Sequence, residues 1–342
     1  MVLPIEVNPA LVEKVNEDTE KQEPKELEAT INFKDVIGLD EVKEILNNNI
    51  GLSIKRKDLF DKFGKKRTMG MIMYGPPGNG KTYIIKALKG EYGINVIVAS
   101  IAEIISSYTG ETEKNIRDLF QRAREASPCA LFFDEFDSLG MNRDKGQSEG
   151  TGQVLQNAVN QLLIEMNGVE ARGEDLFVFG ATNRPWQIDP ALKRGGRFEL
   201  AIYMPLPKYK DRKAMFRYHL RKPLQDGNCK VNFGRIARST SGFASADIEN
   251  ICQQAMLSTI KKEHESKQEQ KITTYTILKI LWNKKTGKSG VEDWFNTFAK
   301  EHMKSMNMKD RQMYFDLIAD VNKFVKNKGL RTTFRVLSLY VV

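Results

Sequence analysis

The stretch Gly75-Pro-Pro-Gly-Asn-Gly-Lys81-Thr82 decides the fold. It follows a short apolar run, Met71–Tyr74, and it precedes a segment with helical periodicity. A strand, a glycine-rich loop and a helix in this order are typical of a phosphate-binding loop. Glycines let backbone N–H groups turn toward phosphate oxygens, and the N-terminus of the helix adds positive charge. We therefore predict that Lys81 binds the β- and γ-phosphates of a nucleotide and that Thr82 binds Mg²⁺.

The rest of the chain predicts an α/β fold around this loop. Apolar runs long enough for buried strands recur between segments of helical spacing, at Met71–Tyr74, Val96–Val98, Ala130–Phe133, Leu176–Phe179 and Leu200–Met204. Strands that alternate with helices indicate a parallel sheet with helices on both faces. After Pro207 the strand-like runs stop, and amphipathic helical patterns follow. We therefore expect a five-stranded parallel sheet followed by a smaller helical domain.

Composition excludes some classes of protein and leaves the meaning of the charge open. The apolar runs are too short for the roughly 18 residues that cross a bilayer, so no membrane span is expected. The first residues lack the pattern of a signal peptide, and the three cysteines fit neither a disulfide framework nor a metal site, so we expect a cytoplasmic protein. The net charge is +9 for the whole chain, −5 for residues 1–32 and +8 for residues 271–342. The basic end is either a solvated surface or a nucleic-acid site.

A second motif supplies the acids that hydrolysis of a magnesium nucleotide requires. Asp134 and Glu135 follow the apolar run that ends at Phe133, some fifty residues after the phosphate-binding loop. Asp134 is expected to hold Mg²⁺, directly or through water, and Glu135 to orient and polarise the attacking water. Paired acids after a strand are also common as plain loop residues. Their position after a phosphate-binding loop favours the catalytic interpretation.

These motifs resemble those of the AAA ATPases, in the branch that includes valosin-containing protein, katanin, spastin and the proteasomal unfoldases. The resemblance runs from Phe33 to about Lys262 as a single ATPase module. It implies a P-loop NTPase fold with a large AAA+ domain, a small helical lid, and ATP and Mg²⁺ as ligands. The implied domains are an acidic flexible leader at 1–32, the large α/β nucleotide-binding domain at 33–206, the lid at 207–286 and a basic helical extension at 287–342.

The resemblance also implies which residues contact the nucleotide. The segment Phe33–Lys43 is similar to the entry segment of the family, whose backbone flanks the adenine, and Gly242–Ile248 is similar to the second sensor, which approaches the nucleotide. Ser245 is open to a second interpretation as the N-cap of a helix. The nucleotide-binding residues expected on this basis are Asp35, Val36, Gly38, Pro77, Gly78, Asn79, Gly80, Lys81, Thr82, Tyr83, Asp134, Ser245 and Ala246.

Two further segments are similar to catalytic motifs of the family. Gly180–Pro185 resembles the first sensor, in which Asn183 would face the γ-phosphate and the attacking water, since its amide can donate and accept at once. The alternative is an ordinary Asx turn before Pro185. Asp189–Phe198 resembles the segment that carries the arginine fingers, with Arg194 and Arg197 in the two finger positions. A finger acts on a neighbouring subunit and therefore requires an oligomer, whereas the alternative is two surface arginines.

A loop between the second and third predicted strands indicates what the ATPase acts on. Ser106–Glu113 is similar to the substrate-gripping pore loop of the family, with Tyr108 in the aromatic position. A loop tyrosine alone is more often a surface or packing residue. The Gly290–Lys304 stretch, with Trp294, is similar to the terminal helix that braces the small domain in katanin-like relatives, where we expect Trp294 to pack.

Together these patterns predict an ATP-hydrolysing homohexamer that threads, unfolds or disassembles protein substrates through a central pore. The alternatives are a nucleic-acid motor or loader, which the basic residues 271–342 would favour, and an assembly scaffold that uses ATP only to assemble. Glu135, Asn183, Arg194 and Arg197 would carry hydrolysis, and they count against the scaffold.

Overall fold

The structure is a computed structural model of the chain. It describes residues 31–105, 110–139, 149–172, 175–189, 191–193, 197–282, 290–303, 306 and 308–327.

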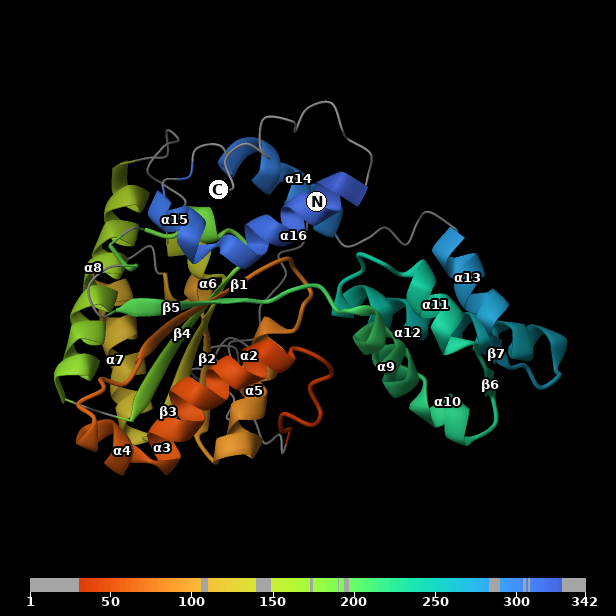
Figure 1. The fold of residues 1–342 in the computed structure, drawn as a ribbon, viewed down its shortest axis with the longest axis horizontal. Helices are drawn as coiled ribbons and strands as arrows, with labels where there is room; N and C mark the ends of the chain where they lie inside the picture. Colours follow the sequence, from red (N-terminus) through yellow and green to blue (C-terminus); the bar gives the residue numbers. More distant parts are fainter. Residues whose placement is uncertain are drawn as a thin grey trace, which may run out of the picture.

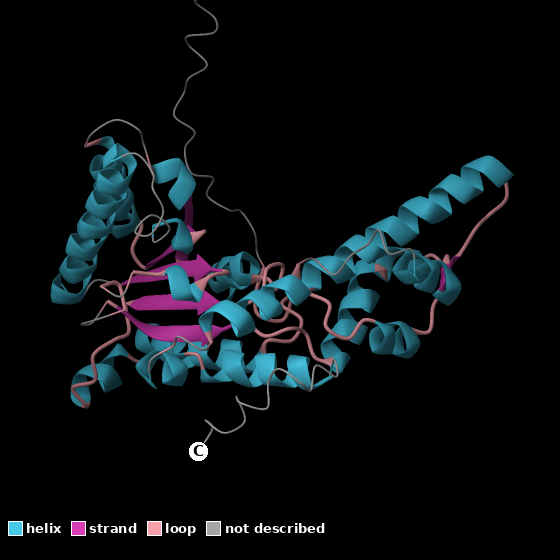
Figure 2. Ribbon diagram, turned by 90° about the horizontal axis from the view of Figure 1, so that it is seen from above, coloured by secondary structure: helices cyan, strands magenta, loops and turns pink. Residues whose placement is uncertain are grey.

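A five-stranded parallel sheet forms the centre of the large domain (Figure 2). Its strands are β1 (Gly70–Tyr74), β2 (Asn95–Ser100), β3 (Cys129–Asp134), β4 (Leu176–Thr182) and β5 (Phe198–Tyr203). The order across the sheet is β2-β3-β4-β1-β5, and every neighbouring pair is parallel. Strands β1 and β4 are buried along their whole length, as expected for central strands covered on both faces. The predicted fold class is confirmed.

Helices cover both faces of the sheet, and an apolar core lies between the sheet and the helices on each face. On one face, Met71 and Met73 pack with Leu46, Ile85 and their neighbours. The elements of this side are α2 (Asp40–Leu46), the π-helical η1 (Asn47–Gly51), α3 (Leu52–Lys55), α4 (Lys57–Lys62) and α5 (Lys81–Tyr92). The opposite face is covered by α6 (Ile101–Ile104), α7 (Glu111–Glu125) and α8 (Glu149–Arg172). Two 3₁₀ turns, η2 (Phe136–Leu139) and η3 (Pro185–Gln187), follow β3 and β4.

The lid is a separate helical unit with its own core, at the right of Figure 1. It consists of α9 (Tyr209–His219), α10 (Arg221–Gln225), α11 (Phe233–Ser239), α12 (Ser245–Ser266) and α13 (Thr274–Trp282). It also contains a two-residue parallel pair, β6 (Cys229–Lys230) and β7 (Ile272–Thr273). The expectation that strands stop after Pro207 missed this pair, because two residues are too few to produce an apolar run.

The C-terminal helices pack against the large domain (Figure 1). They are α14 (Val291–Thr297), the π-helical η4 (Phe298–His302), α15 (Met308–Met313) and α16 (Phe315–Asn327). Their buried residues Phe295, Phe298 and Leu317 belong to the same core as Ile72 and Tyr74 of β1. Trp294 packs, as expected, and the core that it joins is that of the large domain. An amphipathic pattern predicts that a face is buried, and it does not name the surface that buries it.

None of the described helices is both long and apolar enough to cross a lipid bilayer.

Three strand ends bring the predicted motifs to one edge of the sheet. The carboxyl ends of β1, β3 and β4, which are adjacent in the sheet, carry the phosphate-binding loop, the paired acids and Asn183 respectively. Parallel strands end at one edge of a sheet, so this topology brings the three predicted motifs together.

Candidate active site

The phosphate-binding loop joins β1 to α5 and depends on glycine at its closest contacts. Gly75, Gly78 and Gly80 have φ angles of 153°, 75° and 78°, a region that other residues rarely adopt. A Cβ atom on Gly75 would lie 2.4 Å from the carbonyl oxygen of Met204, so a side chain would displace the backbone that follows β5. Helix α5 then begins at Lys81 and points its N-terminus at the loop.

Lys81 contacts both the phosphate-binding loop and the turn that follows β4. Its Nζ donates to the carbonyl oxygens of Gly75 and Pro76, at 3.1 and 3.0 Å, and to Oδ1 of Asn183 at 2.6 Å. Burial lowers the pKa of Lys81 to about 8, because the ammonium loses hydration that the neighbouring carboxylates only partly replace. Those carboxylates belong to Asp134 and Asp137. The ammonium is thus held ready for anionic phosphate oxygens.

Thr82 and Asp134 form the pair expected to hold Mg²⁺. The Thr82 hydroxyl donates to Oδ2 of Asp134 at 3.0 Å, so two hard oxygen ligands from α5 and β3 already lie side by side. Mg²⁺ prefers few protein oxygens together with phosphate and water oxygens, and this donor set fits that preference. Bound there, Mg²⁺ would supply positive charge to the phosphates of the substrate.

Glu135 has a left-handed backbone conformation immediately after β3. Its φ is 52°, which is uncommon for a residue with a Cβ atom and is found most often at functional sites. Its backbone N–H donates to Oδ1 of Asp134 at 2.9 Å, and its side chain is exposed. A carboxylate accessible to solvent at this point is free to take a proton from water. Sequence reasoning found the residue and missed its conformation.

Asn183 follows β4 and is held by its neighbours. The Thr182 hydroxyl donates to Oδ1 of Asp137 at 2.7 Å and accepts from the backbone N–H of Arg184, also at 2.7 Å. The turn is therefore closed by the threonine hydroxyl, while the amide oxygen of Asn183 accepts from Lys81. This arrangement favours the sensor interpretation of Asn183 over a local Asx turn. Asp137, which fixes Thr182, had no motif to mark it in the sequence.

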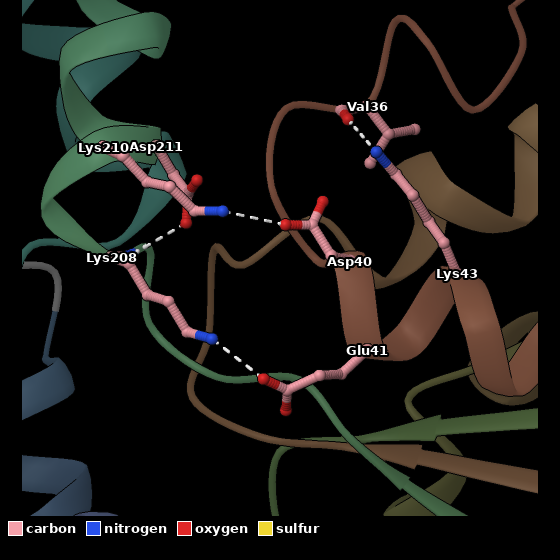
Figure 3. Close-up of polar contacts among 7 residues, drawn as sticks. All are labelled: Val36, Asp40, Glu41, Lys43, Lys208, Lys210 and Asp211. Carbon is pink, nitrogen blue, oxygen red and sulfur yellow. Dashed lines mark hydrogen bonds and ion pairs between the residues drawn. The ribbon is translucent and has the colours of Figure 1, made fainter.

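The entry segment lies between the large domain and the lid (Figure 3). Asp35, Val36 and Leu39 line the cleft, and the carbonyl oxygen of Val36 accepts from Lys43 Nζ at 2.5 Å. Gly38 has a φ of 73°, and a Cβ atom there would lie 2.8 Å from Cγ of Asp211 in α9. The predicted adenine side is thus packed directly on the lid.

The lid also contacts the phosphate-binding loop through the start of α12. The backbone N–H of Ala246 donates to the carbonyl oxygen of Gly78 at 3.0 Å. Ser245 lines the cleft as the first residue of the helix, and the residue before it, Ala244, donates its N–H to Asp247 at 2.8 Å. The alternative that Ser245 is the N-cap of α12 was therefore wrong.

A cleft of about 1460 Å³ runs between the phosphate-binding loop and the lid. The predicted nucleotide-site residues that line it are Asp35, Val36, Gly78, Asn79, Gly80, Lys81, Thr82, Tyr83, Asp134, Asn183, Ser245 and Ala246. Pro77 is half-buried in the same loop. Inside the loop, Oδ1 of Asn79 is buried with no hydrogen-bond partner among the described residues, so a polar acceptor there awaits a donor.

Lid residues that sequence reasoning missed form the far wall of the cleft. Tyr218, His219 and Arg221 line it. The Arg221 guanidinium lies 4.3 Å from the centre of the Tyr218 ring, and both residues line the cleft with Tyr83. Burial, reinforced by Tyr218, raises the pKa of Tyr83, and burial lowers the pKa of His219. No spacing rule connects these lid residues to a nucleotide, so only the fold reveals them.

The remaining predicted residues lie away from this cleft or outside the described chain. The Arg197 guanidinium donates to the carbonyl oxygen of Ala191 at 2.9 Å and to Oδ1 of Asn167 at 3.3 Å, and it does not line the cleft of its own chain. Arg194 and Tyr108 lie outside the described residues. Within the described residues no group of His, Cys, Asp and Glu side chains forms a separate metal site.

Comparison with known families agrees with this geometry. Residues 71–206 match the model of the ATPase family associated with various cellular activities (AAA). Residues 230–274 match the model of the AAA+ lid domain. The first match spans β1 to the end of the large domain, and the second covers the part of the lid from β6 to β7.

Proposed function

This chain belongs to the AAA ATPase family as a single module with its lid, and from that premise we propose that it is a hexameric motor that remodels proteins. In this proposal each subunit binds Mg-ATP in the cleft beside the lid. Hydrolysis drives a protein chain through a central pore and thereby unfolds it or removes it from a complex. The function of ATP hydrolysis belongs to the family, whereas the hexamer, the pore and the substrate are our proposal.

One observation carries the proposal: three strand ends deliver complementary groups to one point. Lys81 Nζ lies 2.6 Å from Oδ1 of Asn183, and Thr82 Oγ1 lies 3.0 Å from Oδ2 of Asp134. The site thus holds a cation that can bind phosphate, two oxygens that can bind Mg²⁺, and an amide that can orient water. These groups contact one another in two pairs. This set suits transfer of a phosphoryl group to water.

The chemistry divides among the residues of this site. Glu135 accepts a proton from water as the water oxygen forms a bond to the γ-phosphorus. The bond between that phosphorus and the β–γ bridging oxygen breaks, so ADP and phosphate leave. Asn183 orients the water, because its amide donates and accepts at once. Lys81 balances the charge of the β- and γ-phosphates.

Assembly is proposed from Arg197. A finger must reach the phosphates of a neighbouring subunit, and Arg197 lies outside the cleft of its own chain. With Arg194 it would complete the site of the next subunit in a ring. The direct contact between Ala246 and the loop at Gly78 would pass changes at the phosphates to the lid, and from the lid to the neighbouring subunit.

The assignment of a protein substrate rests on the Tyr108 loop. An aromatic ring can grip a polypeptide by packing on backbone and side chains, with little preference for sequence. We favour a protein substrate over nucleic acid for this reason.

The cysteines Cys129, Cys229 and Cys252 are free thiols, which suits the reducing cytoplasm where we place the protein.

Substitution of Tyr108 tests the threading proposal. Tyr108→Ala removes the gripping ring and leaves the nucleotide-site residues unchanged, so basal ATP hydrolysis should stay within about threefold of wild type while unfolding falls by about tenfold or more. Tyr108→Phe is the matched control and should keep most of the unfolding rate. Unfolding of a tagged model protein and ATP turnover are measured in the same samples.

Two results would contradict the proposal. Unfolding by Tyr108→Ala at the wild-type rate would remove the central evidence for threading. Stimulation of hydrolysis by DNA but not by the protein substrate, with a steep dependence on salt, would instead favour the nucleic-acid motor.

A further inference from the structure

The C-terminal helices reach the loop that carries Asn183. The indole N–H of Trp294, in α14, donates to the backbone carbonyl oxygen of Asn183. The hydroxyl of Tyr314, between α15 and α16, donates to the carbonyl oxygen of Pro185 at 3.1 Å. A segment more than a hundred residues further along the chain thus supplies donors to two carbonyl groups of the catalytic loop.

The same segment also contacts the strand that leads into the phosphate-binding loop. The hydroxyl of Tyr74, the last residue of β1, donates to the carbonyl oxygen of Met313 at 3.3 Å. The rings of Tyr74 and Tyr314 meet edge to face at 4.9 Å. The C-terminal helices therefore contact β1 and the turn after β4, which are two of the three places where strand ends carry predicted site residues.

Trp294 completes a set of contacts that fixes the backbone of Asn183 from two sides. On one side, Asp137 holds the Thr182 hydroxyl, which in turn holds the N–H of Arg184. On the other side, the carbonyl group of Asn183 itself is held by Trp294. A fixed backbone limits where the short Asn183 side chain can place its amide. Displacements of about 1 Å in a positioning group can slow a reaction about a hundredfold.

We propose that Trp294 is a positioning residue for ATP hydrolysis, which acts through the backbone of Asn183. The inference rests on the proposed role of Asn183 in orienting the attacking water. Because water is oriented during the reaction and not when ATP binds, loss of the indole N–H should lower kcat and leave the affinity for ATP unchanged.

The aromatic cluster around Trp294 supplies a matched control. Trp186 stacks on His302 at 4.4 Å and lies 5.9 Å from the Trp294 ring, so both indoles pack in one cluster. The indole that donates to the Asn183 carbonyl group is that of Trp294. A purely packing role would make the two tryptophans equivalent, whereas a positioning role would not.

The test compares Trp294→Phe with Trp186→Phe. Each change keeps an aromatic ring and removes one indole N–H. For Trp294→Phe we expect kcat to fall about tenfold, with KM and the nucleotide Kd within about twofold of wild type. Trp186→Phe should keep kcat within about twofold. Rates are divided by the number of sites that bind a fluorescent ATP analogue, so unfolded protein does not count.

A second replacement guards against loss of packing. Benzothienylalanine at position 294 puts sulfur in place of the indole N–H and keeps the size of the ring, and it should lower kcat as Trp294→Phe does.

A double variant tests whether Trp294 acts through Asn183. Trp294→Phe should slow the wild-type enzyme but not an Asn183→Ala enzyme, which has already lost the amide that Trp294 positions.

Three outcomes would overturn the inference. They are a wild-type kcat with benzothienylalanine at position 294, an equal loss of kcat in the two Phe variants, and a further tenfold loss when Trp294→Phe is added to Asn183→Ala. Failure of the role assigned to Asn183 itself looks different, because Asn183→Ala alone would then hydrolyse ATP as fast as wild type.

Discussion

The ammonium of Lys81 has a pKa close enough to neutral pH for a bound nucleotide to change its charge. Burial lowers its pKa to about 8. Phosphate oxygens of a bound nucleotide would favour the ammonium and raise that pKa again. Above pH 8 the free protein has lost part of this proton, so ATP binding must take one up. Below about pH 7 the proton is present in both states, and this group adds almost no dependence on pH.

We therefore predict that ATP affinity falls by about twofold between pH 7 and 8 through Lys81 and falls more steeply above pH 8. Once Lys81 is mostly neutral, the fall should approach tenfold per pH unit, the slope for uptake of one proton. The Kd of a fluorescent ATP analogue measured from pH 7 to 9.5 checks this. Lys81→Arg, which stays charged, should bind more weakly with a flat profile. A flat wild-type profile would show that Lys81 does not titrate on binding.

Lys81 and Glu135 should separate binding from turnover. Lys81→Ala removes the cation that balances phosphate charge in the ground state, so nucleotide affinity should fall by about a hundredfold or more. Glu135→Gln keeps the shape of the side chain and removes its basicity, so affinity should stay within about threefold while kcat falls by about a hundredfold. Equilibrium binding and single-turnover hydrolysis measure the two effects. Equal loss of affinity in both variants would contradict these roles.

The residues of the site were predictable where the chemistry is local in sequence. Lys81 and Thr82 follow from one loop, and Asp134 and Glu135 from the end of one strand, because strand ends of a parallel sheet share an edge. Asp137 fixes the turn after β4 through its contact with Thr182, 45 residues away, and no pattern in the sequence records that contact.

At the scale of elements, two exposed ion pairs join α2 to the start of α9, and a hydrogen bond within α9 closes its first turn (Figure 3). Lys208 pairs with Glu41 at 2.8 Å and Lys210 with Asp40 at 3.0 Å, and all four side chains are more than half exposed. Asp211 is buried, and its Oδ2 accepts the N–H of Lys208 at 3.0 Å. Solvent screens the ion pairs, whereas the first turn of α9 depends on Asp211.

We predict that Asp211→Ala destabilises the protein more than either lysine substitution. Loss of this contact at a helix N-terminus should lower the free energy of unfolding by about 1 kcal/mol. Lys208→Ala and Lys210→Ala should each cost less than about 0.5 kcal/mol. Urea unfolding followed by circular dichroism compares the three variants. Larger losses in the lysine variants would mean that the exposed ion pairs contribute more to stability than the buried carboxylate that closes the first turn of α9.

The elements differ in how far the sequence predicted them. The strands of the large sheet were predictable because parallel strands covered on both faces form continuous apolar runs. The π-helical turns η1 and η4 and the β6–β7 pair have no such signature. The docking of α14 was not predictable either, since an apolar stripe around Trp294 fits the lid as well as the large domain. Only the tertiary fold brings Trp294 to Asn183, 111 residues earlier.

At the scale of the whole molecule, the cleft of one chain holds every described member of the predicted site except Glu135, Arg197, Gly38 and Pro77. Glu135 directly follows a lining residue, Asp134, and Gly38 and Pro77 lie within the entry segment and the phosphate-binding loop. Arg197 is different, because its guanidinium contacts Ala191, which precedes β5, and Asn167 of α8. If Arg197 is catalytic, a complete site requires two chains.

Mixing two inactive variants tests that requirement. Lys81→Ala subunits lack the phosphate cation but keep Arg197, and Arg197→Ala subunits have the opposite defect. In a ring assembled at random from equal amounts, a site is complete when an intact Lys81 meets an intact neighbouring Arg197. That occurs at about a quarter of the interfaces, so about a quarter of wild-type ATPase activity should return.

The control mixes Lys81→Ala with Glu135→Gln. Both defects lie in the half of the site that one chain supplies, so this mixture should recover nothing. Activity per subunit of wild type should also rise with protein concentration as rings form. No recovery in the first mixture, or equal recovery in both, would show that Arg197 does not act on the neighbouring subunit's site.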